Sequence, residues 1–402
     1  MGERILTVTS RKLPDPVDLL SWLPSPQGAL SWVRGGDGLV GWGEAARFAP
    51  DGADRFARAQ RWWSDVTARA RVDDELGVPG SGPVAFATIA FADVPGRSVL
   101  VVPRLLVGRR DGVSWTTTVG TARRPAPAPV SPPRGVRYRD GAVGDAAHRR
   151  SVAAAVARIR AGELGKVVLA RDLVAEADAP LDERHLLARL ADRFPTCWVY
   201  AVAGLVGATP ELLLRRDRET VSALLLAGTG WPRPGLADAG LARQLLASPK
   251  DRSEHRYGVR SLTEALAPFC SWLEVPAEPS VLQLANVTHL VTELRGRLAA
   301  DTPLLELAGR VHPTAAAGGW PTAAATRLIG ELEGIDRGGY LGPVGWLDGR
   351  GNGELGVALR CAQVAGTTAR LFAGGGIVAG SDPDTEAAEV AAKFQAIRSA
   401  LG

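Results

Sequence analysis

The segment GPVGWLDGRGNGELGVALRCAQVAGTTARLFAGGGIV, residues 342–378, is the most direct indicator of the fold class. Apolar runs at 342–347, 354–362 and 369–373 have the length of strands, and the connections between them are rich in glycine. Connections this short join antiparallel strands and leave no room for crossover helices. We therefore expect an antiparallel meander near the end of the chain.

Strand and helix patterns alternate through the rest of the sequence. The runs 29–34 and 39–42 flank Gly35-Gly36-Asp37-Gly38, which predicts a hairpin. Residues 83–93 alternate like a further strand, and residues 147–163 have the pattern of a helix. The segment 124–133 holds five prolines and no periodicity, so we expect an extended, mobile connection, either a domain boundary or a long surface loop.

Composition excludes several classes of protein. With 402 residues, 46% of them hydrophobic, the chain can bury a large core. The net charge of +4 is spread along the sequence, which does not suggest nucleic-acid binding. The three cysteines, Cys197, Cys270 and Cys361, suit neither a disulfide framework nor a thiolate zinc site. No stretch nears the roughly 20 apolar residues that span a bilayer, and we expect a soluble, cytoplasmic protein.

Lysine is rare in this arginine-rich chain. Of 47 lysines and arginines, only Lys12, Lys166, Lys250 and Lys393 are lysine. A desolvated ammonium can lose its proton and act as a base, whereas a guanidinium stays protonated. Lys166 begins the apolar run 166–170, where desolvation is expected. Lys166 is therefore a candidate base, the alternative being a lysine that extends to solvent from a strand end.

Two acidic pairs share one spacing, Asp251-x-x-Glu254 and Glu386-x-x-Glu389. On a helix, residues three apart lie on one face. Four carboxylates that converge repel one another unless a cation lies between them, and ligands that are all oxygen favour Mg²⁺. The alternative is a solvated face with an ordinary bridge between Glu389 and Lys393.

Glu211 follows the turn 207–210 and precedes an apolar strand. Desolvation there would raise its pKa, as a general acid requires. The alternative is a glutamate that points to water from the end of a turn.

Two glycine runs, 226–229 and 372–378, would let backbone N–H groups approach an anion closely. Arg360, at the end of an apolar run, could add a bidentate contact to a carboxylate. The alternative for both runs is tight packing or bulges. Residues 374–379 also match the dinucleotide pattern G-x-G-x-x-A, but a meander precedes them and no βαβ unit follows.

These segments, in this order, strongly resemble the chorismate-utilising enzymes, and among them the isochorismate synthases. The likeness covers roughly residues 140–400, while residues 1–120 match only loosely. The segments that carry it are 166–171, 209–212, 226–229, 250–255, 312–314 with 318–321, 342–345 and 373–393.

The resemblance implies an α/β fold of the α+β type, a single large chorismate-binding domain with two layered, mainly antiparallel sheets flanked by helices. Residues 1–120 would form the variable, β-rich N-terminal half of the fold, and 121–140 the proline-rich connection. Residues 141–402 would form the chorismate-binding catalytic region, with the ligand between the sheets.

The resemblance also implies roles for individual residues. Lys166 matches the base that activates water, and Glu211 matches the acid that protonates the leaving hydroxyl. Direct Mg²⁺ ligands would be Glu254 and Glu389, with Asp251 and Glu386 holding metal-bound waters. The implied substrate-binding residues are Gly228, Thr229, His289, Tyr340, Arg360, Gly374, Gly376 and Lys393.

Fewer positions distinguish the subfamilies of these enzymes. Ala227 stands where aminodeoxychorismate synthases carry a nucleophilic lysine, and Lys166 stands where the ammonia-using members lack one, so water is the expected nucleophile. Salicylate synthases share that lysine, but residues 312–317 resemble the isochorismate synthase form of the loop.

We therefore expect an isomerase that converts chorismate to isochorismate with Mg²⁺, for menaquinone or siderophore biosynthesis. A salicylate synthase that goes on to eliminate pyruvate and a catalytically silent ligand-binding paralogue are the alternatives. Chorismate is the expected partner, with no nucleic acid or membrane, and we expect a monomer or weak dimer.

Overall fold

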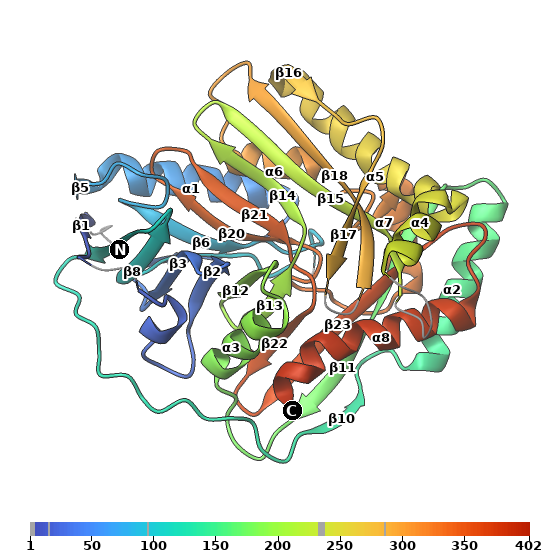
Figure 1. The fold of residues 1–402 in the computed structure, drawn as a ribbon, viewed down its shortest axis with the longest axis horizontal. Helices are drawn as coiled ribbons and strands as arrows, with labels where there is room; N and C mark the ends of the chain where they lie inside the picture. Colours follow the sequence, from blue (N-terminus) through green and yellow to red (C-terminus); the bar gives the residue numbers. More distant parts are fainter. Residues whose placement is uncertain (1–4, 15–16, 95, 232–237, 285–286) are drawn as a thin grey trace.

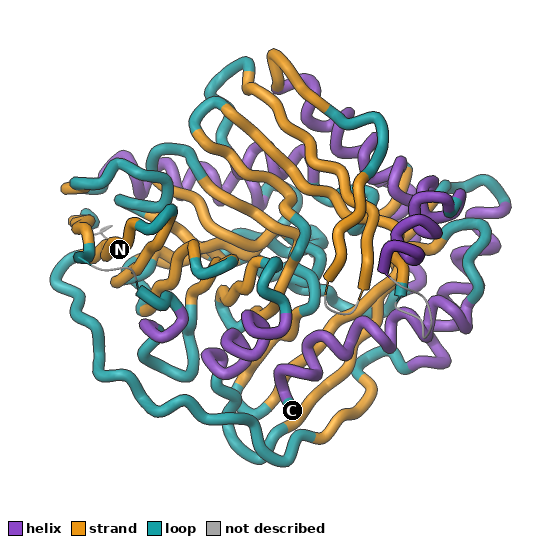
Figure 2. Tube along the Cα trace, viewed as in Figure 1, coloured by secondary structure: helices purple, strands orange, loops and turns teal. Residues whose placement is uncertain are grey.

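The computed structural model describes residues 5–14, 17–94, 96–231, 238–284 and 287–402. Two large sheets form the centre of the molecule, and helices surround them (Figures 1 and 2). Apart from the parallel pair β1 and β5, the strands that pair are antiparallel. The predicted fold class, two layered and mainly antiparallel sheets flanked by helices, is confirmed.

Within the described residues the first sheet has 13 strands. In spatial order they are β10 (Arg137–Asp140), β11 (Lys166–Glu176), β23 (Thr368–Ile377), β22 (Cys361–Ala365), β13 (Leu205–Thr209), β12 (Trp198–Val202), β2 (Leu30–Arg34), β3 (Asp37–Trp42), β8 (Leu105–Arg110), β9 (Val113–Val119), β1 (Thr7–Lys12) and β5 (Arg71–Asp74), with β19 (Gly319–Trp320) paired to β11.

The second sheet has ten strands in the same described ranges. Their order is β16 (Cys270–Glu274), β18 (Val287–Leu298), β15 (Thr220–Gly230), β14 (Leu212–Asp217), β21 (Gly353–Val357), β20 (Pro343–Asp348), β6 (Val84–Thr88), β7 (Val99–Val102) and β4 (Ala46–Phe48), with β17 (Ser280–Leu284) paired to β18.

Helices pack on both sheets. On the first sheet lie α2 (Asp145–Arg160), α3 (Glu183–Arg193), α7 (Thr322–Leu332) and α8 (Pro383–Leu401); on the second lie α4 (Asp238–Ala247), α5 (Pro249–Leu266) and α6 (Leu304–Val311), with α1 (Arg55–Arg69) against α6. Short 3₁₀ turns lie at Leu20–Trp22 and Ala267–Phe269. Among the described residues, no helix has the length and apolar character needed to cross a membrane.

Two apolar cores hold these layers together. One contains Trp32 and Trp198, whose rings stack with centroids 5.8 Å apart, together with Trp346 of the second sheet. The other contains Val390 and Phe394 of α8, packed with side chains of the first sheet. Val390 and Phe394 therefore form a buried apolar face of this helix.

Several local predictions are confirmed. Strands β2 and β3 form the predicted hairpin, and the helix predicted at 147–163 is α2, Asp145–Arg160. The last helix begins at Pro383, where the side chain of Asp382 accepts a hydrogen bond from Thr385 N at 2.9 Å.

The predicted strand 354–362 is wrong in one respect, because it is two strands in different sheets. β21 ends at Val357 and β22 begins at Cys361. Between them Arg360 has φ +44° and the carbonyl of Leu359 accepts a hydrogen bond from Tyr200 Oη at 2.8 Å. The chain thus crosses from the second sheet to the first at Arg360, and β21 and β22 are not neighbours in a meander.

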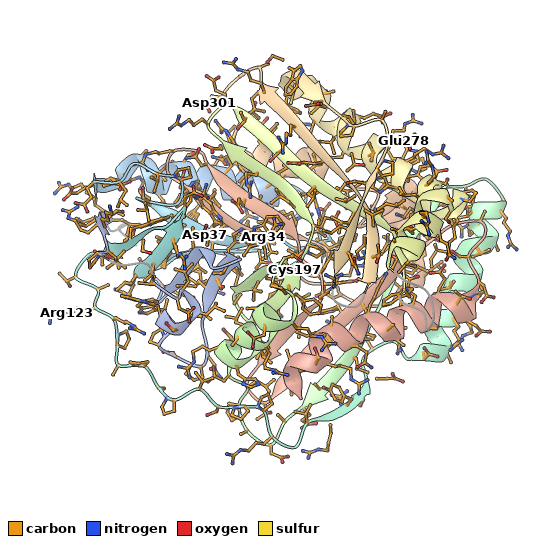
Figure 3. The ribbon with its side chains drawn as sticks, in the orientation of Figure 1. Arg34, Asp37, Arg123, Cys197, Glu278 and Asp301 are labelled. Atoms are coloured by element: carbon orange, nitrogen blue, oxygen red, sulfur yellow. The ribbon has the colours of Figure 1, made fainter. Side chains whose placement is uncertain are left out.

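The proline-rich connection runs along the outer edge of the molecule, where Figure 3 labels Arg123. Its residues 124–133 form no helix or strand. The guanidinium of Arg184 donates to the carbonyls of Ala128 (2.8 Å) and Pro129 (3.0 Å). Strands from both sides of the connection are neighbours in both sheets, as in the pairs β2 with β12 and β6 with β20.

Candidate active site

A cavity lies where the ends of β11 and β23 meet β15 and β18, so both sheets contribute to its walls. Most of the predicted site residues line it, brought together from separate parts of the chain. The predicted residues on its walls are Glu211, Gly228, Thr229, Glu254, His289, Tyr340, Arg360, Gly374, Gly376, Glu389 and Lys393. Lys166, Asp251 and Glu386 are not among the residues that line it.

Lys166 is the first residue of β11 and its side chain is fully buried. Its Nζ lies 3.0 Å from Glu254 Oε1. A Cβ at position 376 would lie 2.4 Å from Glu254 Oε1 and 2.9 Å from Lys166 Cε. Gly376 is therefore the residue that gives the lysine and the carboxylate room to meet.

Three of the four lysines pair with the carboxylates that the sequence marks as a metal site. In each pair the ammonium is the charge that offsets the carboxylate. The pairs are Lys166 with Glu254 (3.0 Å), Lys250 with Glu386 (3.1 Å) and Lys393 with Glu389 (2.7 Å).

Burial and the neighbouring charges shift the pKa values of several groups in these pairs. Burial disfavours the charged form of Glu254, but the ammonium groups of Lys166, Lys393 and Lys250 together outweigh burial and lower the pKa of this carboxyl. Desolvation opposes the charge of Lys250, but the carboxylate of Glu386 raises the pKa of this ammonium. Burial raises the pKa of Glu386, whose Oε1 accepts a hydrogen bond from Ser381 Oγ at 2.6 Å.

The donor set fits Mg²⁺ in chemistry, since it consists of carboxylate oxygens, and both Glu254 and Glu389 line the cavity. Asp251 lies on the same face of α5 as Glu254, and its Oδ1 accepts a hydrogen bond from Thr229 N at 3.2 Å. In the described ranges no group of three or more His, Cys, Asp or Glu side chains is already arranged around one point. A cation would therefore have to draw the carboxylates away from their lysines.

Glu211 lies in the turn that leads into β14 and is 5% exposed. Burial raises its pKa to about 8, although the charge of Lys166 acts in the opposite direction. The side chain is therefore protonated at neutral pH. A protonated carboxyl on the wall of a cavity can donate a proton to a bound ligand.

Gly228 is a β-bulge in the ladder between β15 and β18, because Ala227 pairs with Leu290 and Thr229 pairs with His289. Its φ of +81° is a conformation that glycine adopts without strain. The bulge brings Thr229 Oγ1 within 3.3 Å of His289 Nδ1 at the cavity wall.

The guanidinium of Arg360 enters the cavity from the crossing between the sheets. Its Nη2 lies 3.3 Å from His289 Nε2, and its Nη1 lies 3.6 Å from the thiol of Cys197 near the centre of the molecule (Figure 3). Burial, with the charges of Arg360 and Lys393, lowers the pKa of His289 to about 3. A neutral His289 can accept a hydrogen bond from Arg360 and hold this cation ready for a carboxylate.

Aromatic and backbone groups complete the cavity. Tyr340 stacks on Phe372 with centroids 5.3 Å apart and an interplanar angle of 10°. Lys393 Nζ donates to Gly374 O at 2.9 Å, which fixes α8 against β23.

Sequence reasoning assigned no role in this region to Phe372, Trp231 or Lys250. The scarcity of lysine was a usable signal for Lys250. The apolar character of the other two made them indistinguishable from core residues.

Comparisons with known proteins agree with one another. Residues 126–402 match the family model described as "chorismate binding enzyme". A Mycobacterium tuberculosis protein provisionally named isochorismate synthase MenF is 43% identical over 340 residues, which are 80% of this chain and 87% of that protein. Isochorismate synthase EntC of Escherichia coli K12 is 39% identical over 257 residues, which are 62% of this chain and 66% of that protein. The solved structure of MenF, the menaquinone-specific isochorismate synthase from Escherichia coli, superposes with a TM-score of 0.82 at 25% identity, covering 100% of this chain and 97% of that one.

Proposed function

The chain belongs to the chorismate-binding enzymes, and we propose that within this family it is an isochorismate synthase, an isomerase that converts chorismate to isochorismate. The observation that carries the proposal is a cavity lined by a protonated glutamate and by carboxylates, one of which, Glu254, pairs with the buried Lys166. This set supplies a base, an acid and a site for a divalent cation.

The reaction exchanges one ring hydroxyl for another across a conjugated system. We propose that Lys166, in its neutral form, takes a proton from water as the water oxygen bonds to the ring. The double bond shifts, the bond from the ring to the original hydroxyl breaks, and Glu211 supplies the proton with which that hydroxyl leaves as water. Atoms balance, since one water enters and one departs.

Arg360 and the glycine run of β23 bind and orient the substrate in this scheme. Arg360, held by His289, is placed to receive a carboxylate, and the backbone at Gly374 and Gly376 allows a ligand to approach closely. Glu254 and Glu389 would hold Mg²⁺ directly, with Asp251 and Glu386 behind them. When bound, the ion would fix the ring carboxylate and draw negative charge toward it.

Product analysis tests the proposal. Purified protein with chorismate and Mg²⁺ should form isochorismate as the main product on chromatography, and isochorismate should be converted back. Ala315, Ala316 and Ala317 keep the loop beside the cavity free of bulky side chains. We expect this loop to leave the enolpyruvyl group without the compact geometry that elimination requires.

Pyruvate, measured with lactate dehydrogenase, and salicylate, measured by fluorescence, should stay at the level of isochorismate decaying in buffer alone. Stoichiometric formation of both would identify a salicylate synthase instead. Absence of any chorismate turnover would favour a ligand-binding paralogue.

Chelation should silence the enzyme. We expect EDTA to abolish turnover and added Mg²⁺ to restore it. Glu254→Ala and Glu389→Ala should weaken Mg²⁺ binding in calorimetry at least about ten-fold, since the loss of an outer-sphere partner alone costs this much. The matched control is Glu264→Ala on the same helix, whose carboxylate is 51% exposed and pairs with Arg260. If EDTA does not affect activity, or if Glu254→Ala and Glu389→Ala bind Mg²⁺ as tightly as Glu264→Ala does, then Glu254 and Glu389 are not metal ligands.

A further inference from the structure

His255 is a buried histidine whose two ring nitrogens both have partners. It lies on α5 directly after Glu254 and is 2% exposed. Its Nδ1 lies 3.1 Å from the carbonyl oxygen of Ala227, and its Nε2 lies 2.7 Å from Thr292 Oγ1. It therefore joins α5 to β15 and β18 at one point.

The two partners determine where the ring proton lies. A backbone carbonyl can only accept, so Nδ1 carries the hydrogen and donates to Ala227 O. Nε2 is then the acceptor, and the hydroxyl of Thr292 donates to it. The two contacts have different chemistry and can be removed separately.

The carbonyl that His255 binds is that of the residue immediately before the bulge at Gly228. On the other side of the bulge, Thr229 N donates to Asp251 Oδ1 at 3.2 Å. The bulge is thus tied to α5 on both sides, once through His255 and once through Asp251. The same helix carries Glu254, so these ties set the distance between the Gly228–Thr229 wall and the carboxylates.

We propose that His255 is a positioning residue for chorismate binding, acting through the hydrogen bond from Nδ1 to Ala227 O that holds the Gly228 bulge against α5. This inference rests on the proposed function. Gly228 and Thr229 line the cavity and take no part in the proton transfers, so loosening the bulge should remove binding common to the ground state and the transition state. Such a loss raises KM and leaves kcat nearly unchanged.

Two amide variants separate the contacts. The amide of His255→Asn reaches only as far as Nδ1 and can still donate to Ala227 O. The amide of His255→Gln reaches the position of Nε2 and keeps the contact with Thr292 but loses that with Ala227. We expect His255→Gln to raise the KM for chorismate about ten-fold, the effect of one lost hydrogen bond near the upper end of the usual range. In His255→Asn, KM should stay within about three-fold of the wild type.

Thr292→Val is the matched control, because it removes the partner of Nε2 and leaves the bond to Ala227. It should lower the melting temperature, since it leaves a buried nitrogen without a partner, while KM stays close to the wild-type value. A purely structural histidine would behave differently, with KM following the melting temperature across all three variants.

Equal KM values for His255→Asn and His255→Gln, or a KM raised as much by Thr292→Val, would overturn the proposal. Should His255→Gln fail to fold, the proposal still requires wild-type KM in the other two variants. A wild-type protein that does not turn over chorismate would instead refute the proposed function. In that case, calorimetric titration of chorismate into the same variants still tests the positioning role, with the same ranking expected in Kd.

Discussion

Lys166→Gln should lower turnover at least about 100-fold, the usual scale for loss of a general base, and leave a folded protein. The glutamine amide occupies a similar volume but cannot take a proton from water. The other lysines of the cluster, Lys250 and Lys393, also lower the pKa of Glu254 by their charge. This carboxylate therefore keeps part of its compensation when Lys166 is replaced, and the fold should survive.

Steady-state turnover with saturating chorismate and Mg²⁺, together with circular dichroism, measures the effect. Lys12→Gln is the matched control, because Lys12 is the one lysine outside the carboxylate cluster and it is exposed on β1. It should retain wild-type turnover. A soluble, folded Lys166→Gln enzyme with near-normal turnover would show that another group acts on the water.

Local signals in the sequence predicted the elements whose formation depends on neighbouring residues. The hairpin at Gly35-Gly36 and the helix start at Asp382-Pro383 are set by turn and cap chemistry within a few positions. The boundary between β21 and β22 was not predictable in this way. The sequence indicates one strand at 354–362, whereas at the observed break Leu359 O accepts a hydrogen bond from Tyr200, a residue far away in the sequence.

In the candidate site, too, the sequence predicts individual residues but not the contacts between them. The rarity of lysine and the spacing of the acids singled out Lys166 and Glu254, but their contact is a tertiary pairing between β11 and α5 that no local pattern encodes. The sequence indicated that the converging carboxylates need a cation. The structure places three ammonium groups beside these carboxylates. Of these pairs, only that of Glu389 with Lys393 was expected from the sequence, since the two residues are four apart on one helix.

Glu211→Gln should also lower turnover at least about 100-fold, because an amide cannot give an acidic proton to the departing hydroxyl. The pH dependence makes this prediction specific. Since the pKa of Glu211 is raised to about 8, the side chain is the acid below that pH and loses its proton above it. Wild-type turnover should therefore fall as the pH rises through about 8, and the residual activity of Glu211→Gln should lack this alkaline limb.

Thermal stability supplies the control, because Glu211→Gln should lower the activity but should not lower the melting temperature at alkaline pH. The pKa of Glu211 is higher in the folded protein than in the unfolded chain. Its carboxyl therefore contributes its full stabilisation only at a pH below the pKa of the unfolded chain, and this stabilisation is lost as the pH rises through about 8. Glutamine has no proton to lose, so at pH 8 and above Glu211→Gln should melt at the same temperature as the wild type or higher. A variant that is inactive yet at least as stable at alkaline pH would locate the defect in proton donation. An active variant, or one that retains the alkaline limb, would assign the acid to another group in the cavity.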